Sequence, residues 1–157
     1  MKRHSFLLVS LSLILTLAAS QLRSQSLVEV RLAADSVQPG FTKMALAHSS
    51  HSYFVAPASL LNLGDVDSAS VWTGTSTKGQ PDHAFVIHFK SSLTDSVRRL
   101  TKTNMHKRLA IIIDGVLVGT PRIINPLTSP KIPAPVPSLA EANKLASRVN
   151  RSLNEGH

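Results

Sequence analysis

The sequence predicts an α+β domain with a mostly antiparallel sheet of about five strands, two helices packed on it and a central Asp-Gly hairpin. Three observations lead to this fold class. Asp114-Gly115 separates two runs of β-branched and aliphatic residues, which is the pattern of a two-residue hairpin. Other short stretches alternate apolar with polar residues, as half-buried strands do. Residues 91–104 and the segment from Ser138 onward repeat apolar residues at helical spacing.

The composition favours one domain with an ordinary core. The chain has 157 residues, 43% of them hydrophobic, and single cores typically occupy roughly 100 to 200 residues. The absence of cysteine excludes disulfides, thiol catalysis and thiolate metal sites. The formal charge of +8 predicts a basic protein with a general attraction to anionic surfaces. No cofactor is expected.

The first residues have the pattern of a secretory signal peptide. Met1 to His4 is basic, Phe6 to Ala19 is almost entirely apolar, and Ser20 follows two alanines at a site suited to a signal peptidase. A retained membrane anchor is the alternative, although a bilayer span takes about 20 apolar residues. A secreted or periplasmic protein without a membrane span after cleavage is therefore expected. The expected organisation is a signal peptide at 1–20, a flexible lead at 21–26 and a domain at 27–154.

The part of the chain before the first helix is expected to form several strands. Leu27–Ala33 alternates apolar and polar residues, and residues 35–52 form a loop or weak hairpin. Tyr53–Val55 is a short strand that Pro57 stops. The remaining elements are a helical turn within 60–67 that ends at Gly64 and two strands at 68–73 and 84–89.

The second half of the chain contains both helices and the hairpin. The incoming hairpin strand carries three consecutive isoleucines from Ile111, so both of its faces should be covered. The returning strand, 116–120, ends before Pro121, which cannot continue a ladder. The first helix, at 91–104, places three apolar residues on one face: Leu93, Val97 and Leu100.

A proline-rich segment and a helix complete the chain. Prolines between 126 and 137 impose extended geometry and forbid a central strand. Ser138 and Glu141 have the spacing of a capping box, in which hydroxyl and carboxylate satisfy opposite backbone amides. The box opens a helix with one apolar face, made of Ala142, Leu145, Ala146, Val149 and Leu153.

Six segments in this order give the chain a family resemblance. They are VEVRLAAD, YFVAP, LGDVDSASV, FVIHF, LTKTNMHKRLAIIIDGVLVGTPRIINPLTS and SLAEANKLASRVN. With these segments the chain resembles the head subdomain of the first periplasmic domain of SecD/SecDF, the auxiliary subunit of bacterial protein export. The most specific part is Leu100–Ile124. The resemblance implies an accessory domain that meets exported polypeptides.

The chain also departs from the family pattern. We expect this chain to contain neither the periplasmic base nor the membrane helices in which the family's proton-coupled work is done, so the resemblance implies no proton-driven translocase activity here. His106 stands where the family usually has glycine after the first helix. The segment KIPAPVP replaces a regular strand, which leaves its pairing open.

Few residues suggest chemistry. His48 and His51 are weak metal candidates, because they lie three apart in a Ser-rich loop without further ligands, and a solvated loop is the alternative. No carboxylate pair suits acid/base catalysis, so no catalytic residues are expected. Nucleic acid is not an expected partner, because no aromatics accompany the basic stripe of Arg98, Arg99, Lys102, Lys107 and Arg108.

The favoured function is a non-enzymatic exported binding or accessory domain. Its expected partners are unfolded or extended polypeptides or envelope proteins, bound by β-augmentation at 131–136 or 53–55. One alternative is a small secreted hydrolase that uses Ser49 or Ser50 with His51. Another is a purely structural protein-interaction domain. The sequence leaves the oligomeric state open.

Overall fold

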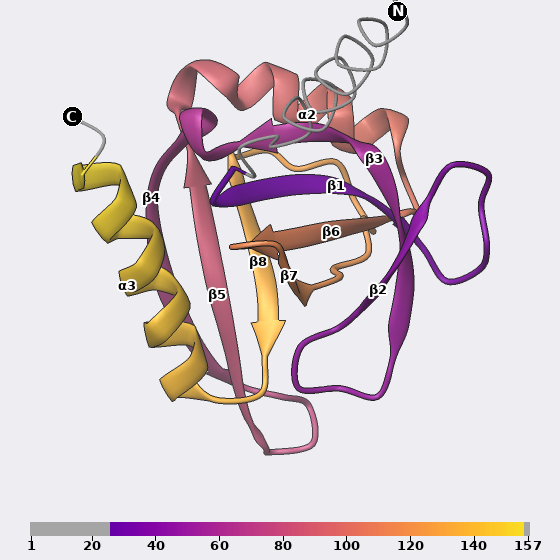
Figure 1. The fold of residues 1–157 in the computed structure, drawn as a ribbon. Helices are drawn as coiled ribbons and strands as arrows, with labels where there is room; N and C mark the ends of the chain where they lie inside the picture. Colours follow the sequence, from indigo (N-terminus) through magenta and orange to yellow (C-terminus); the bar gives the residue numbers. More distant parts are fainter. Residues whose placement is uncertain (1–25, 156–157) are drawn as a thin grey trace, which may run out of the picture.

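The computed structural model describes residues 26–155, which form two antiparallel sheets and two helices (Figure 1). The predicted signal peptide and most of the predicted lead lie outside these residues. One sheet has five strands in the order β2-β3-β1-β6-β7, and the other has the order β4-β5-β8. The α+β prediction with two helices is therefore confirmed, with the strands divided between two sheets. The strands are β1 (Val28–Ala34), β2 (Thr42–Ala45), β3 (Ser52–Asn62), β4 (Val66–Thr75), β5 (Pro81–Phe89), β6 (Arg108–Ile113), β7 (Val116–Gly119) and β8 (Lys131–Val136), and the helices are α2 (Thr94–Thr103) and α3 (Leu139–Glu155).

The Asp-Gly hairpin forms as predicted. Asp114 and Gly115 have φ angles of 50° and 77°, the left-handed values that a two-residue loop of this kind requires. They connect β6 to β7. Ile111 belongs to one hydrophobic core and Ile112 to another, so β6 is covered on both faces. The prediction from the three consecutive isoleucines is confirmed.

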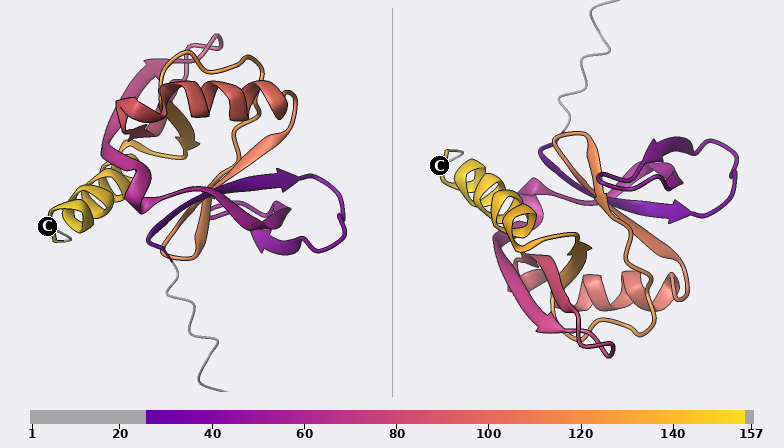
Figure 2. Two further views of the ribbon diagram at one scale, coloured as in Figure 1. Left: turned by 90° about the horizontal axis from the view of Figure 1, so that it is seen from above. Right: turned by 90° about the horizontal axis from the view of Figure 1, so that it is seen from below.

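The larger core fills the space between the two sheets. Seen from above and below, the three-stranded sheet lies on one side and the five-stranded sheet on the other, with α3 and α2 on opposite flanks (Figure 2). Both helices contribute to this core, through Val149 of α3 and Val97 of α2. The sheets contribute Val28, Val30, Ile111, Phe85, Ile87 and Ile132, all essentially without solvent exposure.

A smaller core lies inside the five-stranded sheet, because this sheet curls until its two edges meet. Leu46, directly after β2, forms a parallel bridge with Leu117 of β7. The Ala47 amide donates to the Leu117 carbonyl at 2.8 Å. The curl encloses a small group of buried residues: Ala33, Val55, Ala110, Ile112 and Leu117.

The prediction of a short strand at Tyr53–Val55 is wrong in two respects: where the strand ends, and its place at an edge of the sheet. Strand β3 continues past Pro57 to Asn62. Its pairing with β1 jumps from Val55 opposite Ala33 to Ser59 opposite Arg31, so the residues around Pro57 bulge out of the ladder. The bulge accommodates a proline that has no amide to pair. Strand β3 lies between β2 and β1, so residues 53–55 are not an edge.

Strand β8 runs along the edge of the three-stranded sheet, as its prolines predict. Phe89 of β5 donates to the Pro130 carbonyl at 2.8 Å. Alternation along an antiparallel ladder then turns the backbone of Pro133 and Pro135 away from β5. The outer edge of β8 therefore lacks amide donors at these two positions.

The first helix forms close to its expected bounds, after a 3-10 turn at Ser91–Leu93. Thr101, which is fully buried, donates to the Val97 carbonyl at 2.8 Å and accepts from the Leu127 amide at 3.0 Å. His106, after the helix, adopts a φ of 65°, the left-handed conformation common at helix C-termini. The hydrogen bond between Thr101 and Leu127 connects α2 to the chain after β7.

Candidate binding groove between the hairpin and the last helix

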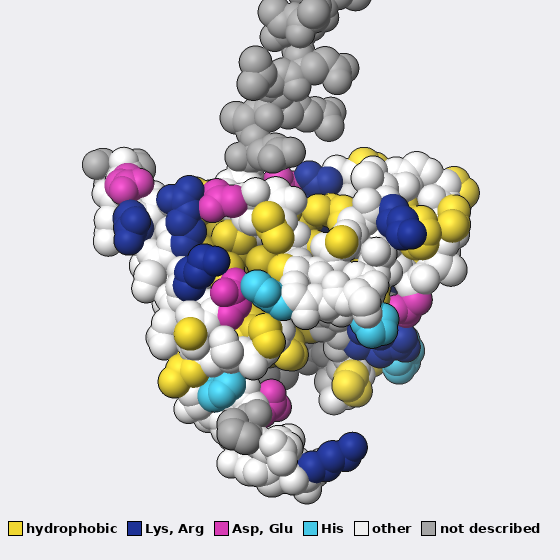
Figure 3. All heavy atoms as spheres, turned by 60° about the horizontal axis from the view of Figure 1, so that its bottom comes forward, with side chains coloured by type: hydrophobic (Ala, Val, Ile, Leu, Met, Phe, Trp, Pro, Cys, Tyr) yellow, Lys and Arg dark blue, Asp and Glu magenta, His cyan; other side chains and the backbone are white. Residues whose placement is uncertain are grey.

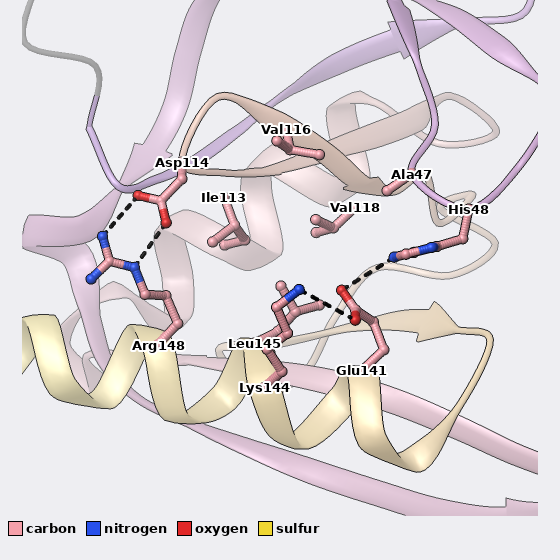
Figure 4. Close-up of a pocket in the computed structure, with 10 residues that line it drawn as sticks. All are labelled: Ala47, His48, Ile113, Asp114, Val116, Val118, Glu141, Lys144, Leu145 and Arg148. Atoms are coloured by element: carbon pink, nitrogen blue, oxygen red, sulfur yellow. Dashed lines mark hydrogen bonds and ion pairs between the residues drawn. The ribbon is translucent and has the colours of Figure 1, made fainter.

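A groove with a volume of about 210 Å³ lies between the β6–β7 hairpin and α3 (Figure 4). On this side of the molecule, hydrophobic side chains lie at the surface among charged side chains of both signs (Figure 3). The groove's floor is apolar and comes from both elements: Ile113, Val116 and Val118 from the hairpin and Leu145 from α3. Val116 is 49% exposed, so part of this apolar floor is open to solvent.

One end of the groove is closed by an ion pair between the hairpin turn and α3. Arg148 donates through Nε to Asp114 Oδ2 at 2.8 Å and through Nη2 to Oδ1 at 3.2 Å. This two-bond geometry is the strongest form of an arginine–carboxylate contact. The hydrogen bond to Asp114, with its charge, raises the pKa of Arg148. The turn residue that the sequence identified for its backbone therefore also ties the hairpin to the helix.

The other end of the groove is closed by Glu141. Its carboxylate lies 3.5 Å from His48 Nε2 and 3.8 Å from Lys144 Nζ. The Glu141 amide donates to Ser138 Oγ at 3.2 Å, so the hydroxyl half of the predicted capping box forms. Within residues 26–155 the Ser138 amide makes no hydrogen bond to the Glu141 carboxylate, which points toward His48 (Figure 4). Only the hydroxyl half of the predicted capping box is therefore present.

A capping box that was not predicted from the sequence caps the start of the 3-10 turn after β3. Asn62 Oδ1 accepts from the Gly64 amide at 2.9 Å, and Asp65 Oδ2 accepts from the Asn62 amide at 2.9 Å. The turn spans Leu63–Asp65, so Gly64 lies inside it and does not end it. An Asn followed three residues later by Asp was the available signal.

The Ser-rich loop does not assemble a catalytic or metal site. Ser49 Oγ lies 2.9 Å from His51 Nδ1, but the same Oγ also accepts the His51 amide at 3.1 Å, as in a local turn. No carboxylate is hydrogen-bonded to His51 among residues 26–155, and Ser50 joins no such contact there. His48 turns to Glu141 instead. Within the same residues, no group of three or more His, Asp or Glu side chains is arranged to hold a metal ion.

Local acidic partners neutralise part of the expected basic stripe. Arg98 lies 3.3 Å from Asp95 within α2, and Arg108 donates to Asp35 at 2.9 Å. The Arg108 guanidinium also lies over the Tyr53 ring, 5.3 Å from its centroid. These contacts explain the position of two of the five cations without a nucleic-acid partner.

Away from the groove, the folded protein disfavours protonation of His88. Burial and the nearby cation Lys131 lower the pKa of His88 from 6.5, against a smaller opposing effect of Asp67. The unfolded chain therefore takes up this proton at a higher pH than the folded protein. The contribution of His88 to stability is complete above about pH 6.5 and falls as the pH drops below that value.

We accordingly expect the wild type to lose more thermal stability than the His88→Gln variant between about pH 7.5 and about pH 5.5. Scanning calorimetry at both pH values measures the difference. An equal loss in the two proteins would show that another group causes the pH dependence.

Comparison with known proteins supports the fold through similarity of structure, and not through similarity of sequence. No family model matches the chain, and no curated protein matches it either. The chain is similar to the "Crystal structure of SecDF in Super-membrane-facing form" at a TM-score of 0.56 and 19% identity, covering 80% of this chain and 18% of that one. It is similar to the "Structure and function of a membrane component SecDF that enhances protein export" at a TM-score of 0.55 and 20% identity, covering 96% and 71%.

The chain therefore corresponds to less than a fifth of the first of these SecDF chains. No helix within residues 26–155 has the length and apolar character needed to cross a membrane. The two similarities extend over 80% and 96% of this chain, so they concern its fold as a whole. The predicted resemblance is confirmed for the fold: the chain folds like a head domain of the SecD/SecDF type.

Proposed function

We propose that this protein is an exported, non-enzymatic accessory domain that holds polypeptide segments in the groove between the hairpin and α3. The apolar floor of this groove carries the proposal. An exposed apolar surface between charged rims is typical of an interaction site, because water is displaced from it favourably.

The size of the groove favours a polypeptide side chain over a small-molecule ligand. Its volume of about 210 Å³ is below the roughly 300–1,000 Å³ of ordinary ligand pockets. A single large aliphatic or aromatic side chain fits such a space. The ion pairs at Asp114 and Glu141 fix the two ends, which leaves the floor accessible between them.

Fold and sequence support the cellular setting of this proposal. The N-terminal pattern predicts export, and one structural neighbour is described as a membrane component that enhances protein export. The isolated Ser49–His51 contact favours a non-enzymatic role, since it lacks an acid that would orient the imidazole.

Binding to a permanently unfolded polypeptide tests the proposal. Reduced, carboxymethylated α-lactalbumin is a suitable probe, measured by fluorescence anisotropy at about 0.15 M salt to screen non-specific attraction. A charge in the groove floor, introduced by Val116→Asp, is expected to weaken binding about tenfold or more because the carboxylate must be desolvated. Val37→Asp is the matched control, because Val37 is 75% exposed and does not line the groove.

Two results would contradict the proposal. One is a wild-type protein that does not bind the unfolded probe. The other is an equal loss of affinity in the Val116→Asp and Val37→Asp variants, which would assign the binding to general charge.

A further inference from the structure

The open edge of the three-stranded sheet lies on β4. The pairing of β4 with β5 places Ser70 opposite Val86 and Trp72 opposite Ala84. Because β5 turns the backbone of Phe85 and Ile87 toward β8, its intervening residues face β4. On β4, the backbone groups that point away from β5 therefore belong to alternate residues: Ala69, Val71, Thr73 and Thr75.

One position of this edge is already closed by α3. The side chain of Asn150 accepts from the Ala69 amide through Oδ1 at 2.8 Å and donates to the Ala69 carbonyl through Nδ2 at 2.9 Å. A carboxamide that bonds both groups of one residue reproduces the contacts of a neighbouring strand. This pair of bonds also confirms that the Ala69 backbone faces outward.

The next outward positions have no such partner. The backbone groups of Val71, Thr73 and Thr75 form no side-chain or loop hydrogen bond among residues 26–155. Thr73 and Thr75 are exposed, and the end of the β4–β5 hairpin projects beyond α3 (Figures 1 and 2). Unpaired amides and carbonyls at regular spacing form a template for another strand.

The other sheet edges are blocked by features of the described chain. Pro133 and Pro135 remove donors from the outer edge of β8. The two edges of the five-stranded sheet meet where Leu46 bridges Leu117. The contrast matters, because proteins normally protect exposed edges. Between Val71 and Thr75, β4 contains no proline or bulge, and no side chain within residues 26–155 hydrogen-bonds its outward backbone groups.

We propose that the β4 edge from Val71 to Thr75 binds an extended polypeptide segment as an added β-strand. Alternating donors and acceptors match the backbone of any extended chain, so the site selects conformation over sequence. Trp72, which is 50% exposed and covers Gly74, offers an apolar surface to a side chain of the added strand. The inference rests on the proposed function only in that the partner is a polypeptide. It assigns a second contact, separate from the groove.

Removal of one outward donor tests this edge. Thr73→Pro deletes an amide that does not pair with β5, so an edge strand tolerates the substitution while its ring obstructs an incoming strand. Affinity for reduced, carboxymethylated α-lactalbumin is expected to fall about tenfold. Thr73→Val, which keeps the amide, is the control and should bind within about twofold of the wild type.

A second measurement uses the unmodified protein and does not depend on how a variant folds. With saturating probe, amide exchange at Val71 and Thr73 should slow about tenfold or more, while the Trp72 amide, already paired with β5, should change little. Unchanged exchange at Val71 and Thr73, or wild-type affinity in Thr73→Pro, would overturn the inference.

The two sites give different patterns of loss. If Val116→Asp weakens binding and Thr73→Pro does not, the groove stands and the edge inference is overturned. If only Thr73→Pro weakens binding, the edge stands and the groove assignment fails. If Thr73→Pro instead abolishes a concentration-dependent dimer seen by analytical ultracentrifugation, the occupant is a second copy, which also overturns the inference as stated.

Discussion

Replacing Asn150 by leucine is expected to lower the free energy of unfolding by about 2–4 kcal/mol. The side chain satisfies both backbone groups of Ala69, which is only 7% exposed. Leucine leaves a buried amide and a buried carbonyl without partners, and each such group costs about 1–3 kcal/mol. Urea denaturation measures the change. Asn143→Leu, at an exposed position of the same helix, is the control and should change stability by less than about 0.5 kcal/mol.

Asn150→Asp separates the loss of hydrogen bonds from the loss of packing. At neutral pH the aspartate still accepts from the Ala69 amide, but its second oxygen faces the Ala69 carbonyl. Protonation turns that oxygen into a donor, so folding raises the pKa of this carboxyl above its unfolded value. The variant should therefore regain stability as the pH falls through the range of that pKa. A variant that is equally destabilised at pH 7 and at about pH 4 would show that packing dominates.

The features that sequence reasoning found are those with local causes. The Asp114-Gly115 turn depends on two adjacent residues that tolerate positive φ, and both adopt it. The prolines of β8 report their own missing amides, so the edge position was predictable.

The features that it missed depend on partners far away in the chain. Asn150 bonds a residue 81 positions earlier, and Arg148 reaches across 34 positions to Asp114. No pattern near α3 shows which of its polar residues faces a strand edge. The bulge at Pro57 has the same origin, because the register with β1 and not the proline decides that β3 continues.

The Ser138–Glu141 motif shows how a correct local signal can lose to a tertiary contact. Its spacing predicts a reciprocal box, and the hydroxyl half forms. The Glu141 carboxylate instead meets His48, which the loop after β2 brings to the helix. The groove could therefore not be predicted from the motif, although three of its lining residues, Asp114, His48 and Glu141, had been singled out for other reasons.

Replacing Gly119 by alanine is expected to destabilise the protein by about 1–3 kcal/mol. A Cβ atom at Gly119 would lie 2.8 Å from the Ala134 Cβ atom, closer than such atoms approach in folded proteins. Ala134 is fully buried on β8, so neither strand can move away without disturbing the core between the sheets. Thermal and urea unfolding of the variant measure the cost.

The matched test is the double variant Gly119→Ala with Ala134→Gly, which moves the methyl group from one strand to the other. Ala134→Gly alone should cost about 1 kcal/mol or more through lost packing and a more flexible backbone. If the steric contact causes the effect, the double variant should be more stable than the sum of the two changes predicts. Strict additivity would mean that the cost arises elsewhere in β7. Because β7 also carries Val116 and Val118 of the groove floor, Gly119→Ala should weaken binding of the unfolded probe as well, and the double variant should recover it.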